Sequence, residues 1–229
     1  MREKEDGQKF PRRGTMYKTK IADRRSPMSD IRYPIITISR EYAAGGRSVA
    51  RGLEKNLGIP FYDKDFVKAT AAASGYSEED ILKEGEQLSR AGRFVTNLLN
   101  PVTYQSSSDN IFYAQKQVIL TLAQKPCIII GRCANVILKD AGVDCFRVFL
   151  YADEEHRWSR AEEIAENGDA DLKKYLSKRD SMRETYYKTY TGHDFGDVHD
   201  YDICLDTGKL GYARCISVLT QIVEGLAAK

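Results

Sequence analysis

The sequence predicts a three-layer α/β/α fold in which helices cover both faces of a five-stranded parallel sheet. Two observations lead to this prediction. Short apolar segments, of the kind that form strands buried on both faces, recur along the 229 residues. Segments with helical periodicity lie between them, and such alternation is typical of a parallel sheet. A chain of this length can bury a full core within one domain.

The first half of the chain contains two of the expected strands. Gly58 ends the first predicted helix, and Asp109 is a suitable N-cap for a later one. The expected elements are a strand over 35–38, a helix over 47–57, a short strand over 60–62, helices over 64–74 and 78–93, a loop over 100–109 and a helix from 109 to about 123.

The second half contains the other three strands. A continuous apolar run over 127–130 predicts a buried strand, and Asp153 can cap the first of two charged helices. The expected elements are strands over 127–130, 146–151 and 201–205, and helices over 134–139, 153 to about 166, 170–190 and 210–226.

Residues 1–30 differ in composition from the rest of the chain. The first 27 residues contain nine Lys or Arg and four Asp or Glu, without apolar periodicity. We expect 1–30 to be a disordered or loosely attached basic arm, and 31–229 to form a single domain. A nucleic-acid-binding role for the arm is the less favoured alternative, because few aromatic side chains are available to stack on bases.

The cysteines and the hydropathy indicate a cytoplasmic protein. The five cysteines form no C-x-x-C pair, and several lie in or beside apolar runs. We interpret them as reduced core thiols rather than as disulfides or metal ligands. No apolar run approaches the roughly 20 residues of a membrane span, and the amino end lacks the apolar middle of a secretion signal.

The segment 35–48 has the layout of a strand, a phosphate loop and a helix. The usual loop reads G-x-x-x-x-G-K-[ST], whereas this window begins with Glu41 and ends Gly46-Arg47-Ser48. Small residues before a helix allow backbone N–H groups to surround a phosphate, and a serine can supply an oxygen to Mg²⁺. A tight turn without a ligand is the alternative. The predicted donor-binding residues are Arg40, Ala44, Gly45, Gly46, Arg47 and Ser48, with Ser48 contacting Mg²⁺ beside the phosphates.

Two further polar residues follow predicted strands. Arg132 comes directly after the strand over 127–130, at the sheet edge where ligands bind in open parallel sheets. It can hold a second phosphate, or cap the sheet edge beside a carboxylate. Asp63 follows the second strand and can either orient an acceptor group or cap the next helix. Both are candidate substrate-binding residues.

Several segments, in order, resemble a known family. Residues 130–141, Ile-Gly-Arg-Cys-Ala-Asn-Val-Ile-Leu-Lys-Asp-Ala, resemble the G-R-D-x-G-T-V-x-x-P-x-A segment of bacterial cytidylate kinases. Residues 146–152, 155–160 and 201–207 are similar to the family's next strand, lid entry and final strand. Ser39-Arg40-Glu41, Gly45-Gly46-Arg47 and the tyrosine-rich segment 186–192 are similar to the cytidylate kinase-like relatives.

The resemblance covers roughly residues 33–225 and implies a P-loop NTPase fold of the nucleoside monophosphate kinase type. Such an enzyme uses ATP and Mg²⁺ to phosphorylate a nucleoside monophosphate or another small acceptor. The resemblance implies a helical lid over 153–195 and an acceptor-side insert over 76–124, which could instead form a homodimer surface. The implied catalytic residues are Arg47, Arg157, Arg160, Arg179 and Arg183.

The sequence departs from the family pattern at the phosphate loop, the acceptor segment and the lid. Arg47 stands for the loop lysine, and Cys133 replaces an Asp that helps to bind the acceptor nucleotide, which argues against CMP. The lid motif R-D-x-x-D-x-x-R lacks its second Asp and its final Arg. A non-catalytic nucleotide or phosphate sensor on the same fold is therefore the alternative function.

Overall fold

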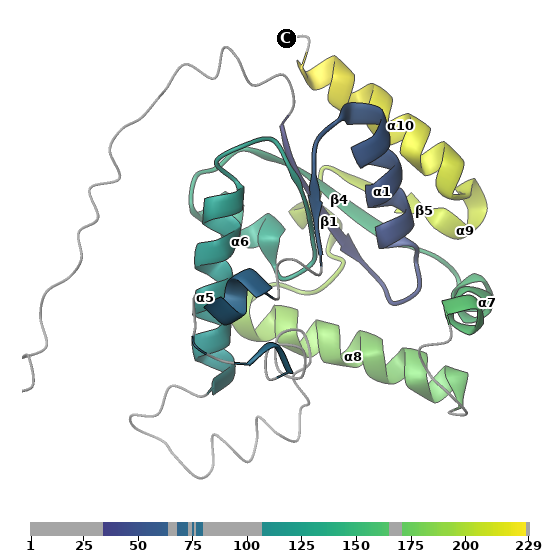
Figure 1. The fold of residues 1–229 in the computed structure, drawn as a ribbon. Helices are drawn as coiled ribbons and strands as arrows, with labels where there is room; N and C mark the ends of the chain where they lie inside the picture. Colours follow the sequence, from purple (N-terminus) through teal and green to yellow (C-terminus); the bar gives the residue numbers. More distant parts are fainter. Residues whose placement is uncertain are drawn as a thin grey trace, which may run out of the picture. The chain divides into compact units, whose positions relative to one another are not determined.

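The computed structural model describes residues 34–63, 68–72, 75, 77–79, 107–164 and 171–227. Within these residues the chain forms one sheet of five parallel strands in the order β2-β3-β1-β4-β5, with helices on both faces (Figure 1). The predicted three-layer fold is therefore confirmed. The strands are β1 (Ile35–Arg40), β2 (Phe61–Tyr62), β3 (Ile128–Ile130), β4 (Cys145–Tyr151) and β5 (Ile203–Asp206).

The predicted helices that the structure describes agree with it to within a few residues, whereas η2 and α9 were not predicted. The predicted basic arm and most of the predicted helix over 78–93 lie outside the described residues, and of 64–74 only 68–72 are described as helical. The helices are α1 (Gly46–Leu57), α5 (Ser107–Leu122), α6 (Ala134–Asp140), α7 (Glu154–Ile164), α8 (Leu172–Thr191), the 3₁₀-helix η2 (Val198–Asp200), α9 (Thr207–Leu210) and α10 (Tyr212–Ala227).

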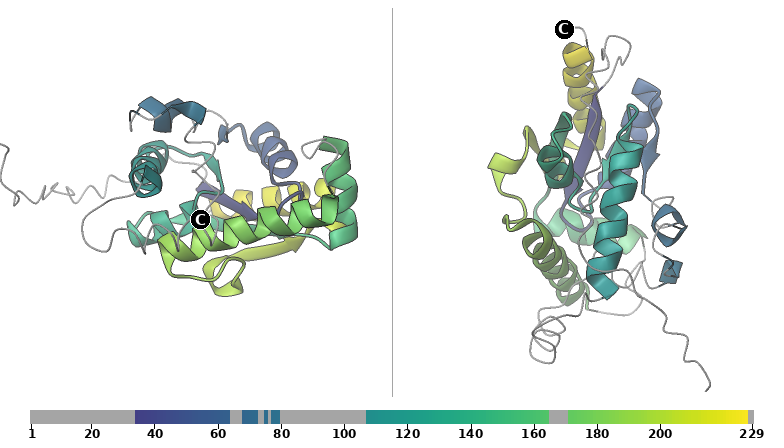
Figure 2. Two further views of the ribbon diagram at one scale, coloured as in Figure 1. Left: turned by 90° about the horizontal axis from the view of Figure 1, so that it is seen from below. Right: turned by 90° about the vertical axis from the view of Figure 1, so that its left-hand side faces the viewer.

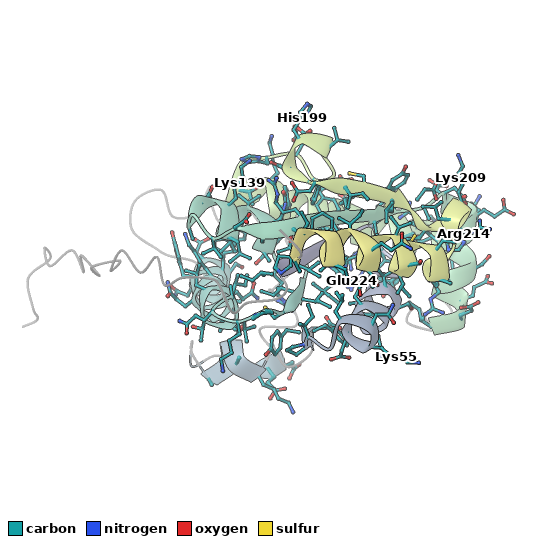
Figure 3. All side chains as sticks on the ribbon, turned by 90° about the horizontal axis from the view of Figure 1, so that it is seen from above. Lys55, Lys139, His199, Lys209, Arg214 and Glu224 are labelled. Atoms are coloured by element: carbon teal, nitrogen blue, oxygen red, sulfur yellow. The ribbon has the colours of Figure 1, made fainter. Side chains whose placement is uncertain are left out.

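Helices α1 and α10 cover one face of the sheet. Ile36 and Ile38 of β1 point toward this face and are fully buried against Leu53 of α1 and Leu219 of α10. The opposite sides of these helices face solvent: Lys55 of α1 and Glu224 of α10 are exposed (Figure 3), as are Val218 and Leu226 of α10. The pattern of buried and exposed side chains therefore explains why both helices pack as they do.

Helices α5, α6 and α8 cover the other face (Figure 2). Ile35 of β1 and Ile129 of β3 contribute to this cluster, together with Ile119 of α5 and Tyr186 and Tyr187 of α8. The tyrosine-rich segment is thus part of the core. Because both tyrosines are buried, the carboxyl-terminal half of α8 is fixed to the sheet.

The connections after β1 and β3 leave the same edge of the sheet toward opposite faces. Ile38 of β1 is paired with Ile130 of β3, so the two strands end side by side. The chain after β1 enters α1 on one face, and the chain after β3 enters α6 on the other. This is the topological switch point, where open α/β sheets bind ligands.

Two sequence-based expectations concern the hydropathy of the helices and the state of the cysteines. In the part of the chain that the structure describes, no helix is both long and apolar enough to cross a membrane. All five cysteines are free. Burial raises the pKa of Cys127 and of Cys145 to about 11, so both thiols are protonated at neutral pH.

Candidate functional site

The loop between β1 and α1 presents the start of a helix without a side-chain cap. Residues 41–45 connect the strand to α1, and Gly45 is the N-cap residue with φ 79° and no side-chain hydrogen bond to the helix. Ala43 also has a positive φ of 62°. The first turn of α1 contains no acidic residue. Its backbone N–H groups and the helix dipole therefore suit an anion.

Two neighbours from the carboxyl end of the chain define the shape of this loop. The buried hydroxyl of Thr207, at the start of α9, contacts the carbonyl oxygens of Ala44 at 3.0 Å and Tyr151 at 3.1 Å. The ring of Tyr212 lies so close to Gly45 that a Cβ on Gly45 would be 2.1 Å from Tyr212 Cε1. Sequence reasoning did not identify either residue, because both are about 160 positions away along the chain.

Polar side chains from three elements gather at the start of α1. Arg47 forms an ion pair with Asp63, which follows β2. The Arg160 guanidinium of α7 donates to Ser48 Oγ at 3.3 Å and contacts Glu163 at 2.6 Å. Four of the predicted site residues are therefore brought together beside the loop.

Arg179 and Arg183 of α8 gather around Tyr42. Their guanidinium carbons lie 5.3 Å and 5.5 Å from the centre of the Tyr42 ring. Arg183 also donates to the carbonyl oxygen of Arg40 at 3.3 Å. The Arg40 side chain packs over Gly46, where an added Cβ would lie 3.1 Å from Arg40 Cγ. Three predicted cations therefore surround the end of β1.

Arg157 of α7 packs against the loop before α1 and has two acidic neighbours. It is 8% exposed, forms an ion pair with Asp180, and its Nε lies 3.5 Å from a Glu41 oxygen. Asp180 also accepts a hydrogen bond from the Tyr42 backbone N–H at 2.8 Å. Glu41 accepts one from the Ala152 N–H at 3.2 Å. The sequence marked these two acids only by their positions. Asp180 lies in the segment that resembles the family's lid motif, and Glu41 stands where the usual loop has its first glycine.

Burial raises the pKa of the Glu41 carboxyl above its usual range, although Arg157 and the Ala152 N–H lower it. Folding therefore favours the protonated form. This carboxyl contributes stability that is fully present below its unfolded pKa and is lost as pH rises through the folded one. Glu41→Gln removes this pH dependence while retaining an oxygen acceptor.

We therefore expect the melting temperature of Glu41→Gln, relative to the wild type, to rise as pH increases from about 4 to about 8. Thermal denaturation of both proteins across this range measures the difference. A variant that becomes relatively less stable with increasing pH would show that the attraction to Arg157 outweighs burial.

Arg132 lies in a turn with a left-handed backbone conformation, which is unusual for residues other than glycine. Gly131, Arg132 and Cys133 all have positive φ, at 70°, 58° and 57°. The Ala134 N–H closes the turn on the Gly131 carbonyl at 3.1 Å. Left-handed backbone costs a non-glycine residue about 1–2 kcal/mol, and such strain is concentrated at functional sites. The turn places Arg132 at the switch point, whereas Cys133 is buried in the core.

The residues around the loop fit a magnesium nucleotide. The start of α1 can bind phosphate oxygens, and Ser48 can supply a hydroxyl oxygen to Mg²⁺. Within the described ranges, no group of three His, Cys, Asp or Glu is arranged to hold a metal ion.

Comparisons with known proteins identify a family and several relatives of this chain. Residues 35–209 match the model of the cytidylate kinase-like family. The cytidylate kinase of Methanothrix thermoacetophila is 27% identical over 198 residues, which cover 84% of this chain and 99% of that protein. The cytidylate kinase of Thermoplasma acidophilum is 27% identical over 176 residues, which cover 75% and 82%.

A solved structure supports the fold. The crystal structure of an uncharacterized protein from Eubacterium ventriosum has a TM-score of 0.61 and 24% identity, covering 83% of this chain and 98% of that one. The family match includes the loop before α1, the Arg132 turn and the helices α7 and α8, and it extends over more than half of the chain. The chain therefore belongs to the cytidylate kinase-like family.

Proposed function

We propose that this protein is an ATP-dependent phosphotransferase that uses Mg²⁺ and transfers the γ-phosphoryl group to a nucleoside monophosphate or another small acceptor. One observation carries the proposal: the uncapped start of α1 lies beside Arg47, Ser48 and Arg160 at the switch point of the sheet. Membership in a kinase-like family supports the same reaction class.

The donor phosphates would bind at the loop. Backbone N–H groups of Gly46 and its neighbours would contact the β- and γ-phosphate oxygens, and Arg47 would leave Asp63 to contact them through its planar fork. Ser48 would supply a hydroxyl oxygen to Mg²⁺, which would neutralise charge on the phosphates. Arg160 is already within reach of Ser48 and would neutralise charge on the transferred group.

The acceptor would bind between the ends of β2 and β3. Arg132 can contact an acceptor phosphate, and Asp63 can orient a hydroxyl once Arg47 has moved to the nucleotide. Cys133 offers no carboxylate to a ribose, and its side chain is buried. We therefore favour an acceptor other than CMP.

In the transfer, an acceptor oxygen forms a bond to the γ-phosphorus while the bond between that phosphorus and the β–γ bridging oxygen breaks. ADP leaves with the electron pair. Such a reaction needs alignment, positive charge and exclusion of water more than covalent help. Arg179 and Arg183, which lie around Tyr42 on α8, are further cations that could supply this charge.

A thermal-shift titration tests the proposal directly. We expect ATP with Mg²⁺ to raise the melting temperature. At an ATP concentration of 100 Kd, binding would increase the free energy of unfolding by about 2.7 kcal/mol. In the wild type, we expect a larger increase in melting temperature with ATP and Mg²⁺ than with ATP alone. Ser48→Ala should lose most of this difference. Ser217→Ala, at an exposed position of α10, is the matched control.

No stabilisation by any nucleoside triphosphate, together with no turnover across a panel of monophosphates, would contradict the proposal. An equal response to Mg²⁺ in Ser48→Ala and the wild type would contradict only the role of Ser48.

A non-catalytic sensor on the same fold is the second candidate. The observation in its favour is that Arg47, in place of the usual lysine, is ion-paired with Asp63. A sensor would bind ATP and release no ADP with any acceptor. Isotopically labelled ATP distinguishes the two functions.

A homodimer through the segment 76–124 remains a prediction.

A further inference from the structure

We propose that Asp180 is a positioning residue that holds the phosphate loop in its nucleotide-binding shape. The inference rests on the proposed function, because it assigns a role at the same site. Asp180 lies on α8, 138 positions from the loop residue that it contacts. We infer that it acts through Arg157 and through the backbone of Tyr42.

Asp180 contacts the backbone N–H of Tyr42, and Arg157 contacts the backbone carbonyl of the same residue. Asp180 Oδ1 accepts from the Tyr42 N–H at 2.8 Å, and Arg157 Nη1 lies 3.5 Å from the Tyr42 carbonyl oxygen. The other Asp180 oxygen pairs with the same Arg157 nitrogen. One peptide segment of the loop is thereby fixed by an ion pair from two helices.

The ion pair between Arg157 and Asp180 is largely removed from water, so breaking it is costly. The side chain of Arg157 is 10% exposed and that of Asp180 is 18% exposed. Removing one member of such a pair leaves the other charge buried with fewer partners, so the loss exceeds that of a surface pair. Glu41 contacts Arg157 only at 3.5 Å, and one of its oxygens also accepts from Ala152, so it is the weaker partner.

The side chain of Tyr42 connects the same segment to α7 and α8. Its ring is buried with Ala161 and Leu176, and it meets the Tyr175 ring edge-on at a centroid distance of 5.5 Å. The other half of α8 is fixed to the core through Tyr186. Asp180 is therefore presented by a helix that is anchored at both sides of it, as a precise binding site requires.

This arrangement replaces what the usual loop achieves with glycine. In this chain Glu41 stands at the position of the first loop glycine, and Tyr42 follows it. Phosphate binding by backbone N–H groups requires them to be held within about 0.5 Å of the productive geometry. The structure thus assigns to Asp180 the task of fixing the amino-terminal half of the loop, while Thr207 and Tyr212 fix the other half.

Two variants and one matched control test the inference in the full chain. Asp180→Asn retains an acceptor for the Tyr42 N–H but removes the charge that faces Arg157. Asp180→Ala removes both contacts. Glu184→Ala, an exposed acidic position one turn further along α8, is the control.

The first measurement is hydrogen exchange of the peptide that contains residues 41–46, without nucleotide. We expect exchange at the Tyr42 amide to be about tenfold faster in Asp180→Ala than in the wild type and in Glu184→Ala, with Asp180→Asn between them. Equal protection of this peptide in all four proteins would overturn the inference, whatever the protein does with ATP.

The second measurement is the affinity for ATP. Trp158 is the only tryptophan in the chain and packs against the Tyr42 cluster, so its fluorescence reports on this region. We expect Asp180→Ala to bind ATP about tenfold more weakly, Asp180→Asn to recover part of the loss, and Glu184→Ala to bind like the wild type. Unchanged affinity in Asp180→Ala would refute the positioning role.

The two measurements separate the two proposals. A wild type that shows a protected loop but no binding of ATP removes the proposed function and leaves the role of Asp180 in loop structure. A wild type that binds ATP, with Asp180 variants that bind equally well, keeps the proposed function and removes this inference.

Discussion

Gly45→Ala is expected to lower the melting temperature by about 10 °C and to abolish ATP binding. Two effects add at this position. The φ of 79° is strained for a residue with a Cβ, by about 1–2 kcal/mol. The Cβ would also lie 2.1 Å from the Tyr212 ring, and displacing a packed side chain costs about 1–3 kcal/mol. For a domain of this size, each kcal/mol changes the melting temperature by about 2–4 °C.

Gly58→Ala separates these two effects. Gly58 has a similar φ of 69°, but nothing lies within 4 Å of an added Cβ. We expect this variant to show only the backbone contribution, about 2–8 °C, with ATP binding intact. The double variant Gly45→Ala/Tyr212→Ala should recover part of the difference. Equal effects at both glycines would show that the Tyr212 ring moves aside easily and does not shape the loop.

Most of the fold could be predicted because each strand carries its own local signal. Runs such as 128–130 are short, apolar and β-branched, and they are buried on both faces, so the pattern alone identifies them. The structure differs where local signals are weak. Helix α9 has only four residues, starts directly after β5 and is capped by Asp206, so its sequence carries no helical period.

The candidate site could be predicted only in part, for a physical reason. Loop residues such as Ser48 are recognisable from their spacing, because the chain itself brings them together. The acids that pair with the predicted cations come from segments that are distant along the chain: Asp180 is 23 positions from Arg157, and Glu41 is 116 positions from it. No local pattern predicts such pairs, because tertiary packing of α7 and α8 on the loop creates them.

Arg47 gives the second large predicted effect. We expect Arg47→Ala to reduce phosphoryl transfer by about 10³-fold, since cations that contact the transferred group contribute 10³–10⁵ in comparable reactions. Arg47→Lys should retain more activity, because lysine keeps the charge but loses the two-pronged contact. Arg51→Ala, exposed one turn further along α1, is the matched control and should behave as the wild type. Release of ADP from labelled ATP measures all four proteins.

The ion pair with Asp63 makes the Arg47 experiment more informative than a simple loss of activity. If Arg47 exchanges Asp63 for phosphate on binding, Asp63→Asn should tighten ATP binding, because the competing carboxylate charge is removed. If Arg47 instead stays with Asp63, Arg47→Ala should leave ATP affinity unchanged and destabilise only the β2 end of the site. Retained binding without ADP release in both the wild type and Arg47→Ala would favour the sensor. Full turnover in Arg47→Ala would show that this arginine does not take the place of the lysine in the reaction.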